Sequence, residues 1–224
     1  MKIGIESNLL RSLFRNVYFI NGTAYAGKST MVKLLSEKYD GICCGENYHE
    51  PLMDAVDEIR QPNLSYIRQL KDWQAFVSRT PQEYAAWIEG CSEEAADLEL
   101  LMLIRHTASG RRVFVDTNLS PGLLREISDY RHVLFMLAPQ EISVNRFFER
   151  EDREKQFIYQ VLLQSADREK AFENYRECLR AVNSEAQIRA FAESGFYCIY
   201  REEARSVSDT LALVEKHFGL DLDR

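Results

Sequence analysis

Five short runs of β-branched and aromatic residues stand apart along the chain. They are residues 17–20 (VYFI), 41–44 (GICC), 113–115 (VFV), 132–137 (HVLFML) and 196–200 (FYCIY). None of them shows a sustained alternation of apolar and polar positions. Short continuous apolar runs are typical of strands that are buried on both faces of a parallel sheet. The pattern therefore predicts five buried strands.

The segments between these runs have the spacing of amphipathic helices. Two apolar stripes carry this signal: Met31, Leu34 and Leu35 within 29–39, and Ala96, Leu100, Leu101 and Ile104 within 93–106. Four prolines occupy places where a helix should begin or a strand should end: Pro62, Pro81, Pro121 and Pro139. Strands that alternate with helices predict an α/β fold with right-handed crossovers.

Two of the connections are longer than a single crossover helix requires. The first separates the second and third predicted strands, and the second separates the fourth and fifth. Both are mostly helical in pattern, and a long helix is expected over 157–191. We therefore expect a single domain over residues 1–224, with helical excursions at 47–109 and 140–192.

Composition and charge narrow the classes of protein. The chain is 46% hydrophobic and 28% charged, which excludes collagen-like and disordered chains. Its net charge of −7 argues against a nucleic-acid partner. The five cysteines form no CxxC pair, which is typical of proteins with reduced thiols. No apolar run approaches the roughly 20 residues that a membrane span needs. We expect a cytoplasmic protein without a membrane partner.

The strongest chemical signal lies between the first strand and the first long helix. Residues 22–29 (GTAYAGKS) fit the pattern GxxxxGK[ST] at every position. Glycines let a backbone wrap closely around phosphate oxygens, and the helix N-terminus adds partial positive charge. Lys28 would reach the β- and γ-phosphates, and the Ser29 hydroxyl would ligate Mg²⁺. The alternative is an ordinary glycine turn before a helix with an exposed lysine.

We call residues 22–30 the glycine loop. All nine are candidate nucleotide-binding residues: Gly22, Thr23, Ala24, Tyr25, Ala26, Gly27, Lys28, Ser29 and Thr30. With this loop the chain resembles the P-loop kinases of small molecules, a group that includes nucleoside, nucleoside-monophosphate, shikimate and antibiotic kinases. The resemblance is specific over the loop and looser, as an order of elements, over nearly the whole chain.

Other P-loop classes lack their signatures here. A GTPase should carry NKxD after a strand, whereas the fourth strand is followed by APQE at 138–141. A helicase-like motor should carry Asp-Glu after its Walker B strand, whereas Asp116 is followed by Thr117. No LSGGQ-like signature of a transporter ATPase is present. Kinase remains the best-supported class, partly by elimination.

The resemblance implies a three-layer P-loop NTPase fold with a five-stranded, mainly parallel sheet in the order 2-3-1-4-5. It also implies a cofactor set of ATP and Mg²⁺ and transfer of the γ-phosphoryl to a small hydroxyl- or phosphate-bearing acceptor. The excursion at 47–109 would bind the acceptor, and the excursion at 140–192 would supply a lid.

Three carboxylates follow predicted strands, where ligands bind in open α/β sheets. Asp116 follows the third strand and would hold Mg²⁺ together with Ser29, while Glu46 and Glu50 follow the second. Glu50-Pro51 is similar to the Glu-Pro of deoxynucleoside and thymidylate kinases, but Asp116-Thr117-Asn118 departs from their Asp-Arg-Ser or Asp-Arg-Tyr. Which of the three acids is a catalytic base stays open, and each could instead cap a helix or lie in a solvated loop.

An arginine-rich segment, residues 145–155 (NRFFEREDREK), follows the fourth strand. In kinases of this type a lid lies here, and its arginines stabilise the charge on the transferring phosphoryl group. Arg146 and Arg150 are spaced to share one helical face, with Arg153 three residues further along. The alternative is a surface helix with interleaved Glu–Arg pairs.

Several points stay open at this level. Trp73 and Trp87 could form a platform for a ring-bearing acceptor or could simply be core residues, and no motif identifies the acceptor. Arg201 or Arg205, after the fifth strand, could stack on adenine. A different function is a nucleotide-sensing ATPase, in which Phe172, Tyr175 and Leu179 form a stripe for a protein partner or a homodimer.

Overall fold

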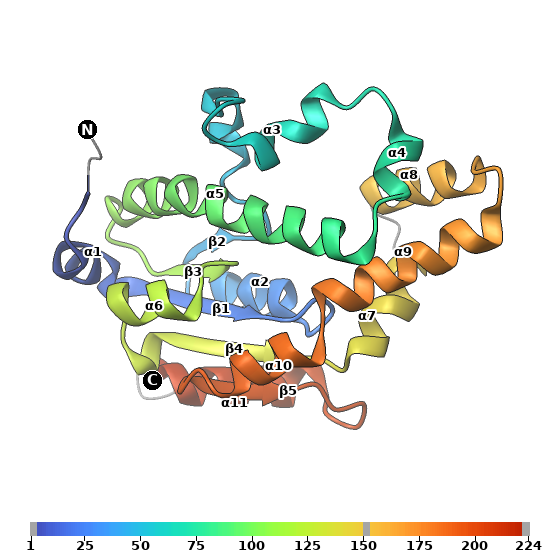
Figure 1. Cartoon of the computed structure of the whole chain (residues 1–224). Helices are drawn as coiled ribbons and strands as arrows, with labels where there is room; N and C mark the ends of the chain where they lie inside the picture. Colours follow the sequence, from blue (N-terminus) through green and yellow to red (C-terminus); the bar gives the residue numbers. More distant parts are fainter. Residues whose placement is uncertain (1–3, 150–152, 221–224) are drawn as a thin grey trace.

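The computed structural model describes residues 4–149 and 153–220, and its centre is a five-stranded sheet (Figure 1). The strands are β1 (Val17–Gly22), β2 (Ile42–Cys44), β3 (Val113–Asp116), β4 (Val133–Leu137) and β5 (Tyr197–Tyr200). Their order is β2-β3-β1-β4-β5, and every pairing between them is parallel. The predicted fold class and strand order are therefore confirmed.

Eleven α-helices surround this sheet within the described residues. They are α1 (Ser7–Leu13), α2 (Lys28–Lys38), α3 (Pro62–Gln69), α4 (Trp73–Val77), α5 (Pro81–Thr107), α6 (Pro121–Ile127), α7 (Gln140–Arg146), α8 (Arg153–Leu163), α9 (Arg168–Val182), α10 (Glu185–Ala192) and α11 (Val207–Phe218). Pro62, Pro81 and Pro121 each stand at the first helical position, where a missing N–H costs nothing.

The side chains of β1 alternate between two hydrophobic cores. Phe19 points into a core shared with α1, α5, α6 and α10, whereas Ile20 points into a core shared with α2 and α11. Both side chains are fully buried. A sheet covered by helices on both faces gives the three layers of an α/β fold.

A third core lies away from the sheet and joins α4, α5, α7, α8 and α9. Trp73 and Trp87 are partly buried and pack against it, so both contribute to this core. The stripe of Phe172, Tyr175 and Leu179 also belongs to this core, and its last two residues are buried. The prediction that this stripe forms a partner surface is therefore wrong.

Two helix predictions need correction. The long helix expected over 157–191 is divided among α8, α9 and α10, because Asp167 and Ser184 each accept a backbone hydrogen bond as the N-cap of a new helix. In α5, Ala96, Leu100 and Ile104 pack against the first core as expected, and only Leu101 departs from the expected stripe. Leu101 is 56% exposed, whereas Leu98 and Met102 are buried.

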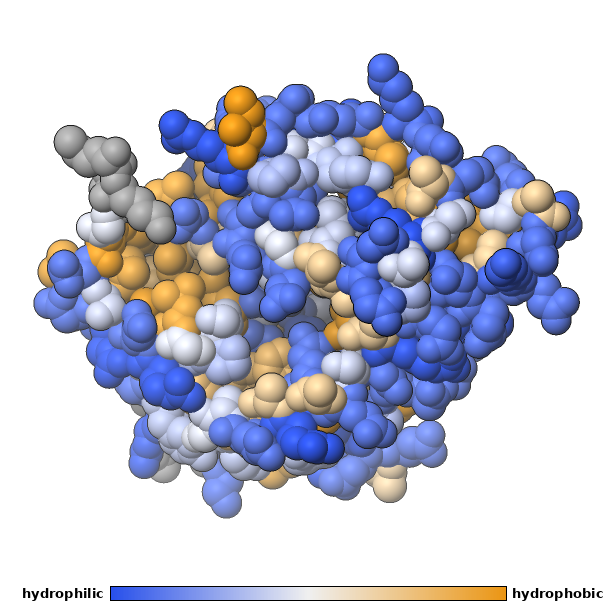
Figure 2. All heavy atoms as spheres, in the orientation of Figure 1, coloured by the Kyte–Doolittle hydropathy of each residue, from blue (hydrophilic) through white to orange (hydrophobic). Residues whose placement is uncertain are grey.

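The surface is mostly hydrophilic on the face shown in Figure 2, with hydrophobic residues gathered around α1. Ile5, Leu9 and Leu13 are each about half exposed at that end of the molecule (46–54%). Within residues 4–149 and 153–220, no helix has both the length and the apolar character that crossing a membrane requires.

Candidate active site at the glycine loop

Gly22 is the point where the glycine loop leaves the sheet, and no other residue fits there. Its φ of 130° lies in a region that L side chains rarely adopt. A Cβ at this position would be 1.9 Å from the backbone oxygen of Met136 in β4. Gly27, with φ of 98°, then begins α2 as its N-cap. The two glycines of the motif thus fix both ends of the turn.

Contacts on two sides anchor the first residues of the loop. The Thr23 hydroxyl accepts a hydrogen bond from the N–H of Ala138 at 2.7 Å, which joins the loop to the end of β4. The N–H of Ala24 donates to the side-chain oxygen of Asn183 at 3.2 Å. Asn183 is a buried residue directly after α9. The loop is therefore held in shape by segments that are distant in sequence.

The second half of the loop offers backbone donors. Among the described residues, no acceptor takes the N–H groups of Ala26, Gly27, Lys28 and Ser29. They surround the N-terminus of α2, where the helix dipole adds partial positive charge. A concave set of free N–H groups at a helix start is a site for phosphate oxygens. Tyr25 adopts φ of 61°, and Thr30 faces the cavity described below.

Lys28, Ser29 and Asp116 meet beside these donors. The Ser29 hydroxyl donates to Asp116 Oδ2 at 2.6 Å, and Lys28 Nζ lies 3.8 Å from Asp116 Oδ1. Lys28 Nζ also donates to the carbonyl of Thr23 at 3.1 Å. Asp116 is 6% exposed, and burial raises its pKa against the opposing charge of Lys28. The sequence-predicted trio is thus brought together by the structure.

The Ser29 hydroxyl and the Asp116 carboxylate are also suited to binding a magnesium ion. Mg²⁺ prefers hard oxygen ligands and is commonly held by one or two protein groups together with phosphate oxygens and water. Ser29 Oγ and Asp116 Oδ2 are a hydroxyl and a carboxylate at the edge of the phosphate-binding turn. The described residues hold no cluster of three or more His, Cys, Asp or Glu side chains that could bind a metal without a phosphate.

Glu46 and Glu50 occupy different positions after β2. Glu46 is exposed, and its charge contributes to the raised pKa of Asp116. Glu50 is also exposed, begins the 3₁₀ helix Glu50–Ala55, and acts electrostatically on His49. Of the two glutamates, it is Glu46 whose charge acts on the pKa of Asp116.

Glu99 of α5 is a buried acid at this end of the sheet that the sequence analysis missed. Its Oε2 accepts hydrogen bonds from the Thr117 hydroxyl at 2.7 Å and the Tyr48 hydroxyl at 2.9 Å. His49 Nδ1 lies 3.8 Å from Oε1 and makes no hydrogen bond to the described residues. Burial raises the pKa of Glu99 more than these hydroxyls lower it. The sequence did hold a signal, because a glutamate stands between Leu98 and Met102 on a buried face.

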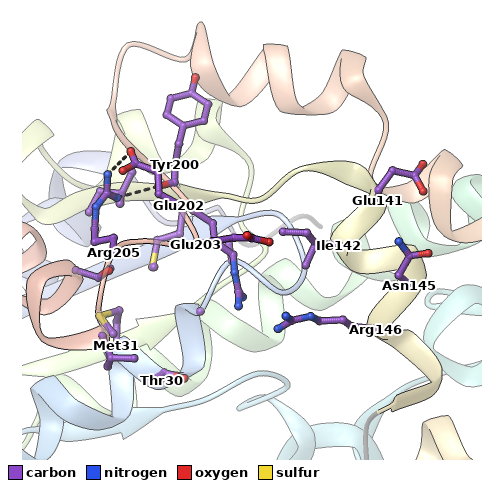
Figure 3. Close-up of a pocket in the computed structure, with 17 residues that line it drawn as sticks. Thr30, Met31, Glu141, Ile142, Asn145, Arg146, Tyr200, Glu202, Glu203 and Arg205 are labelled. Atoms are coloured by element: carbon purple, nitrogen blue, oxygen red, sulfur yellow. Dashed lines mark hydrogen bonds and ion pairs between the residues drawn. The ribbon is translucent and has the colours of Figure 1, made fainter.

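A cavity of about 580 Å³ opens on the other side of the loop (Figure 3). Its walls come from the loop, from α7 and from the segment after β5. Arg201 crosses its inner wall and donates to the carbonyl of Tyr25, while Arg205 pairs with Glu202 at the rim. The volume is typical of small-molecule sites.

The arginine-rich segment does not form one helix face. Arg146 ends α7 and lines the cavity, with its guanidinium directed inward (Figure 3). Phe147 and Phe148 then turn into the third core, and Arg153 begins α8 as an exposed residue. Arg150 lies outside the described residues. The expected shared face of Arg146 and Arg150 therefore falls partly outside the described residues, whereas Arg146 and Arg153 lie in two separate helices.

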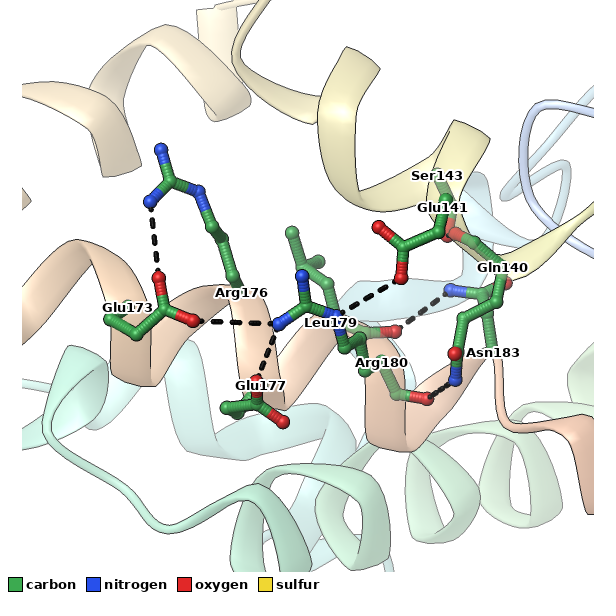
Figure 4. A network of polar contacts seen from close by, with 9 residues as sticks. All are labelled: Gln140, Glu141, Ser143, Glu173, Arg176, Glu177, Leu179, Arg180 and Asn183. Atoms are coloured by element: carbon green, nitrogen blue, oxygen red, sulfur yellow. Dashed lines mark hydrogen bonds and ion pairs between the residues drawn. The ribbon is translucent and has the colours of Figure 1, made fainter.

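A polar network fixes α7 against α9 (Figure 4). Arg180 pairs with Glu141 at 3.2 Å, with Glu177 at 2.5 Å and with Glu173 at 3.5 Å, and its carbonyl accepts from Gln140. Hydrogen bonds to Glu141 and Glu177 raise the pKa of Arg180. Helix α7, which carries Arg146, is therefore fixed to α9. Asn183, directly after α9, in turn contacts the glycine loop at Ala24.

The described geometry thus joins a phosphate-shaped turn, a buried acid, a lysine and a neighbouring cavity. Compared with known proteins, the chain matches no family model, no curated protein and no solved structure.

Proposed function

We propose that this protein is a Mg²⁺-dependent P-loop kinase that moves the γ-phosphoryl group of ATP to a small hydroxyl- or phosphate-bearing molecule. The observation that carries the proposal is the grouping of Lys28, Ser29 and Asp116 at the open end of the glycine loop. A GxxxxGK[ST] turn that follows a buried strand, opens a helix and faces an acid from a neighbouring strand has the parts that phosphoryl transfer needs.

The triphosphate would lie on the free N–H groups of the loop, with Lys28 against its β- and γ-phosphates. The nucleoside would enter the cavity bounded by Arg201 and Arg205, and Arg146 would close over the phosphates from α7. Ser29 and Asp116 would hold the metal ion. When bound, Mg²⁺ would neutralise part of the charge on the phosphate oxygens.

Glu46 is the acid best placed to receive a proton from an acceptor hydroxyl, because it is exposed and electrostatically linked to Asp116. The acceptor oxygen would form a bond to the γ-phosphorus while the bond to the β–γ bridging oxygen breaks. ADP would leave with that oxygen, and the hydroxyl proton would pass to Glu46. An acceptor that already bears an ionised phosphate would not need this base.

A thermal-shift experiment tests the proposal. A non-hydrolysable ATP analogue with Mg²⁺ should raise the unfolding temperature, and a second compound from a panel of nucleosides, sugars, shikimate and aminoglycosides should raise it further. Stabilisation by nucleotide alone, across a broad panel, would instead favour the nucleotide-sensing ATPase.

Lys28→Ala should abolish the nucleotide shift and lower turnover by at least about 100-fold, because a partly buried cation is removed from the phosphates. Lys33→Ala is the matched control, since the Lys33 side chain lies in the same helix but is 72% exposed and pairs with Glu37. Unchanged nucleotide affinity and turnover in Lys28→Ala would overturn the proposed function.

A further inference from the structure

A second cavity, of about 660 Å³, lies in the helical region between α3, α4 and α5. Its walls include Tyr66, Ser78, Arg79, Glu83 and Trp87. It shares no residue with the cavity beside the glycine loop. In Figure 1, α3 and α4 lie on the side of α5 that faces away from the sheet.

Its position along α5 also separates it from the proposed metal site. Trp87 is in the first turns of α5, whereas Glu99, which contacts Thr117 next to Asp116, is twelve residues later. At 1.5 Å per residue, this spacing corresponds to about 18 Å along the helix. A molecule in the second cavity would therefore occupy a different place from the nucleotide and its metal.

Arg79 gives this cavity its chemistry. Its guanidinium carbon lies 4.2 Å from the ring centroid of Tyr66, 5.2 Å from that of Phe76 and 5.5 Å from that of Trp87. Its Nη1 is buried and has no hydrogen-bond partner among the described residues. Cation–π contacts orient the group but leave its in-plane N–H donors unused.

No described carboxylate neutralises this guanidinium within ion-pair distance. Glu83 lines the same cavity, but its Oε2 accepts from both the N–H and the hydroxyl of Thr80 in the capping box of α5. Those two hydrogen bonds hold the pKa of Glu83 below its usual value, with a smaller contribution from Arg79. A buried donor without a partner is costly, and a ligand that accepts from it removes that cost.

We propose that this cavity is a second binding site, for a small organic anion that bears a planar ring and a carboxylate or phosphate group. The acidic group would accept from the free donors of Arg79, since a guanidinium matches two acceptor oxygens at once. The ring would lie against Tyr66 and Trp87, whose faces and edges form the apolar part of the wall. The site is independent of the proposed phosphoryl transfer.

Calorimetric titration of the whole chain tests the proposal with four probes. Benzoate and phenyl phosphate represent the two acidic groups, benzyl alcohol has the ring without charge, and inorganic phosphate has the charge without a ring. At least one ring-bearing anion should bind saturably and more tightly than both single-feature probes. Saturable binding by neither anion would overturn the proposal.

Two substitutions assign the binding to this cavity. Arg79→Gln should weaken binding of the ring-bearing anion by at least about tenfold, because the charged guanidinium group is lost. Glu83→Gln should strengthen it by about two- to threefold, because one negative charge is removed while a glutamine still completes the capping box. Glu89→Gln, an exposed change on the same helix outside the cavity, is the control.

The Glu83 variant keeps the test meaningful if Arg79→Gln fails to fold, since it predicts a gain in affinity. Equal affinity in wild type and in a folded Arg79→Gln variant, or unchanged affinity in Glu83→Gln, would contradict the assignment. Lys28→Ala should bind the ring-bearing anion as wild type does. Failure of the proposed kinase function and failure of this second site therefore give different results.

Discussion

The glycine-loop end of the sheet and the helical region of α3, α4, α5, α8 and α9 are positioned in different ways. At the sheet, backbone pairing places Asp116 and the start of the glycine loop, since Gly22 lies opposite Met136 and Ile20 opposite Asp116. In the helical region, packed aromatic rings from distant segments do so, including Phe76 on Trp87 at 5.2 Å. A position fixed by backbone pairing tolerates a change of side chain but not a change of backbone conformation. A position fixed by ring packing is instead sensitive to the size and shape of the side chain.

The largest effect is expected at Gly22. Gly22→Ala should lower the free energy of unfolding by about 3–5 kcal/mol, because a Cβ combines an unfavourable φ with an overlap that only a backbone shift can relieve. The same shift would displace the loop, so nucleotide binding should be lost. Chemical denaturation followed by circular dichroism measures the first effect, and the nucleotide thermal shift measures the second.

Gly110→Ala is the matched control for this prediction. Gly110 also has a positive φ, of 72°, but a Cβ there would meet no atom within 4 Å. It should cost only about 1–2 kcal/mol, the usual penalty for the left-handed conformation. Equal losses in the two variants would show that close approach to β4 does not constrain the loop.

A smaller effect is expected from polar atoms inside the third core. The hydroxyls of Tyr84 in α5 and Tyr175 in α9 lie 3.1 Å apart, and both side chains are buried. Tyr84→Phe and Tyr175→Phe should each destabilise by about 1–2 kcal/mol, since each leaves the other hydroxyl unpaired. The double variant should lose less than the sum of the two.

A double-mutant cycle from urea denaturation measures this coupling. Tyr130→Phe, at a 52%-exposed position, should change stability by less than about 0.5 kcal/mol. Strictly additive losses at Tyr84 and Tyr175 would mean that the two helices are held by ring packing alone.

The same contrast decides what could be read from the sequence. The strands follow from local apolar runs, and the meeting of Lys28, Ser29 and Asp116 follows from a loop of fixed spacing and an acid at a strand end. The strand order was expected only from the resemblance of the loop to that of P-loop kinases. The first strand extends two residues beyond its apolar run, to Gly22, because its ladder with β4 continues there. Local signals were sufficient wherever the backbone itself forms the site.

Local signals failed where side chains distant in sequence meet. Helix α7 ends at Arg146, and Phe147 and Phe148 pack into the third core, although the apolar spacing alone does not indicate an end there. The cavity at Arg79 requires three helices to be placed together before its unpaired guanidinium becomes visible. Tertiary packing overrides helix periodicity at such positions.

Glu99 lies where the two regions join. Its replacement by glutamine should change the free energy of unfolding only slightly at a fixed pH. In Glu99→Gln, the amide oxygen can accept from Tyr48 and Thr117, while the new N–H₂ can face the unpartnered Nδ1 of His49. Stability near neutral pH should therefore change by less than about 1 kcal/mol. The informative quantity is how that difference varies with pH.

Burial raises the pKa of Glu99 above its ordinary value of 4.5, so the folded state holds this proton at a pH where the unfolded chain has released it. Wild-type stability should consequently fall relative to Glu99→Gln as pH rises from about 4.5 toward the folded-state pKa, and the difference should be constant above it. Urea denaturation of both proteins across that range measures the slope. A difference that grows in favour of wild type with rising pH would mean that the hydrogen bonds from the Tyr48 and Thr117 hydroxyls, rather than burial, determine the direction of the pKa shift of Glu99.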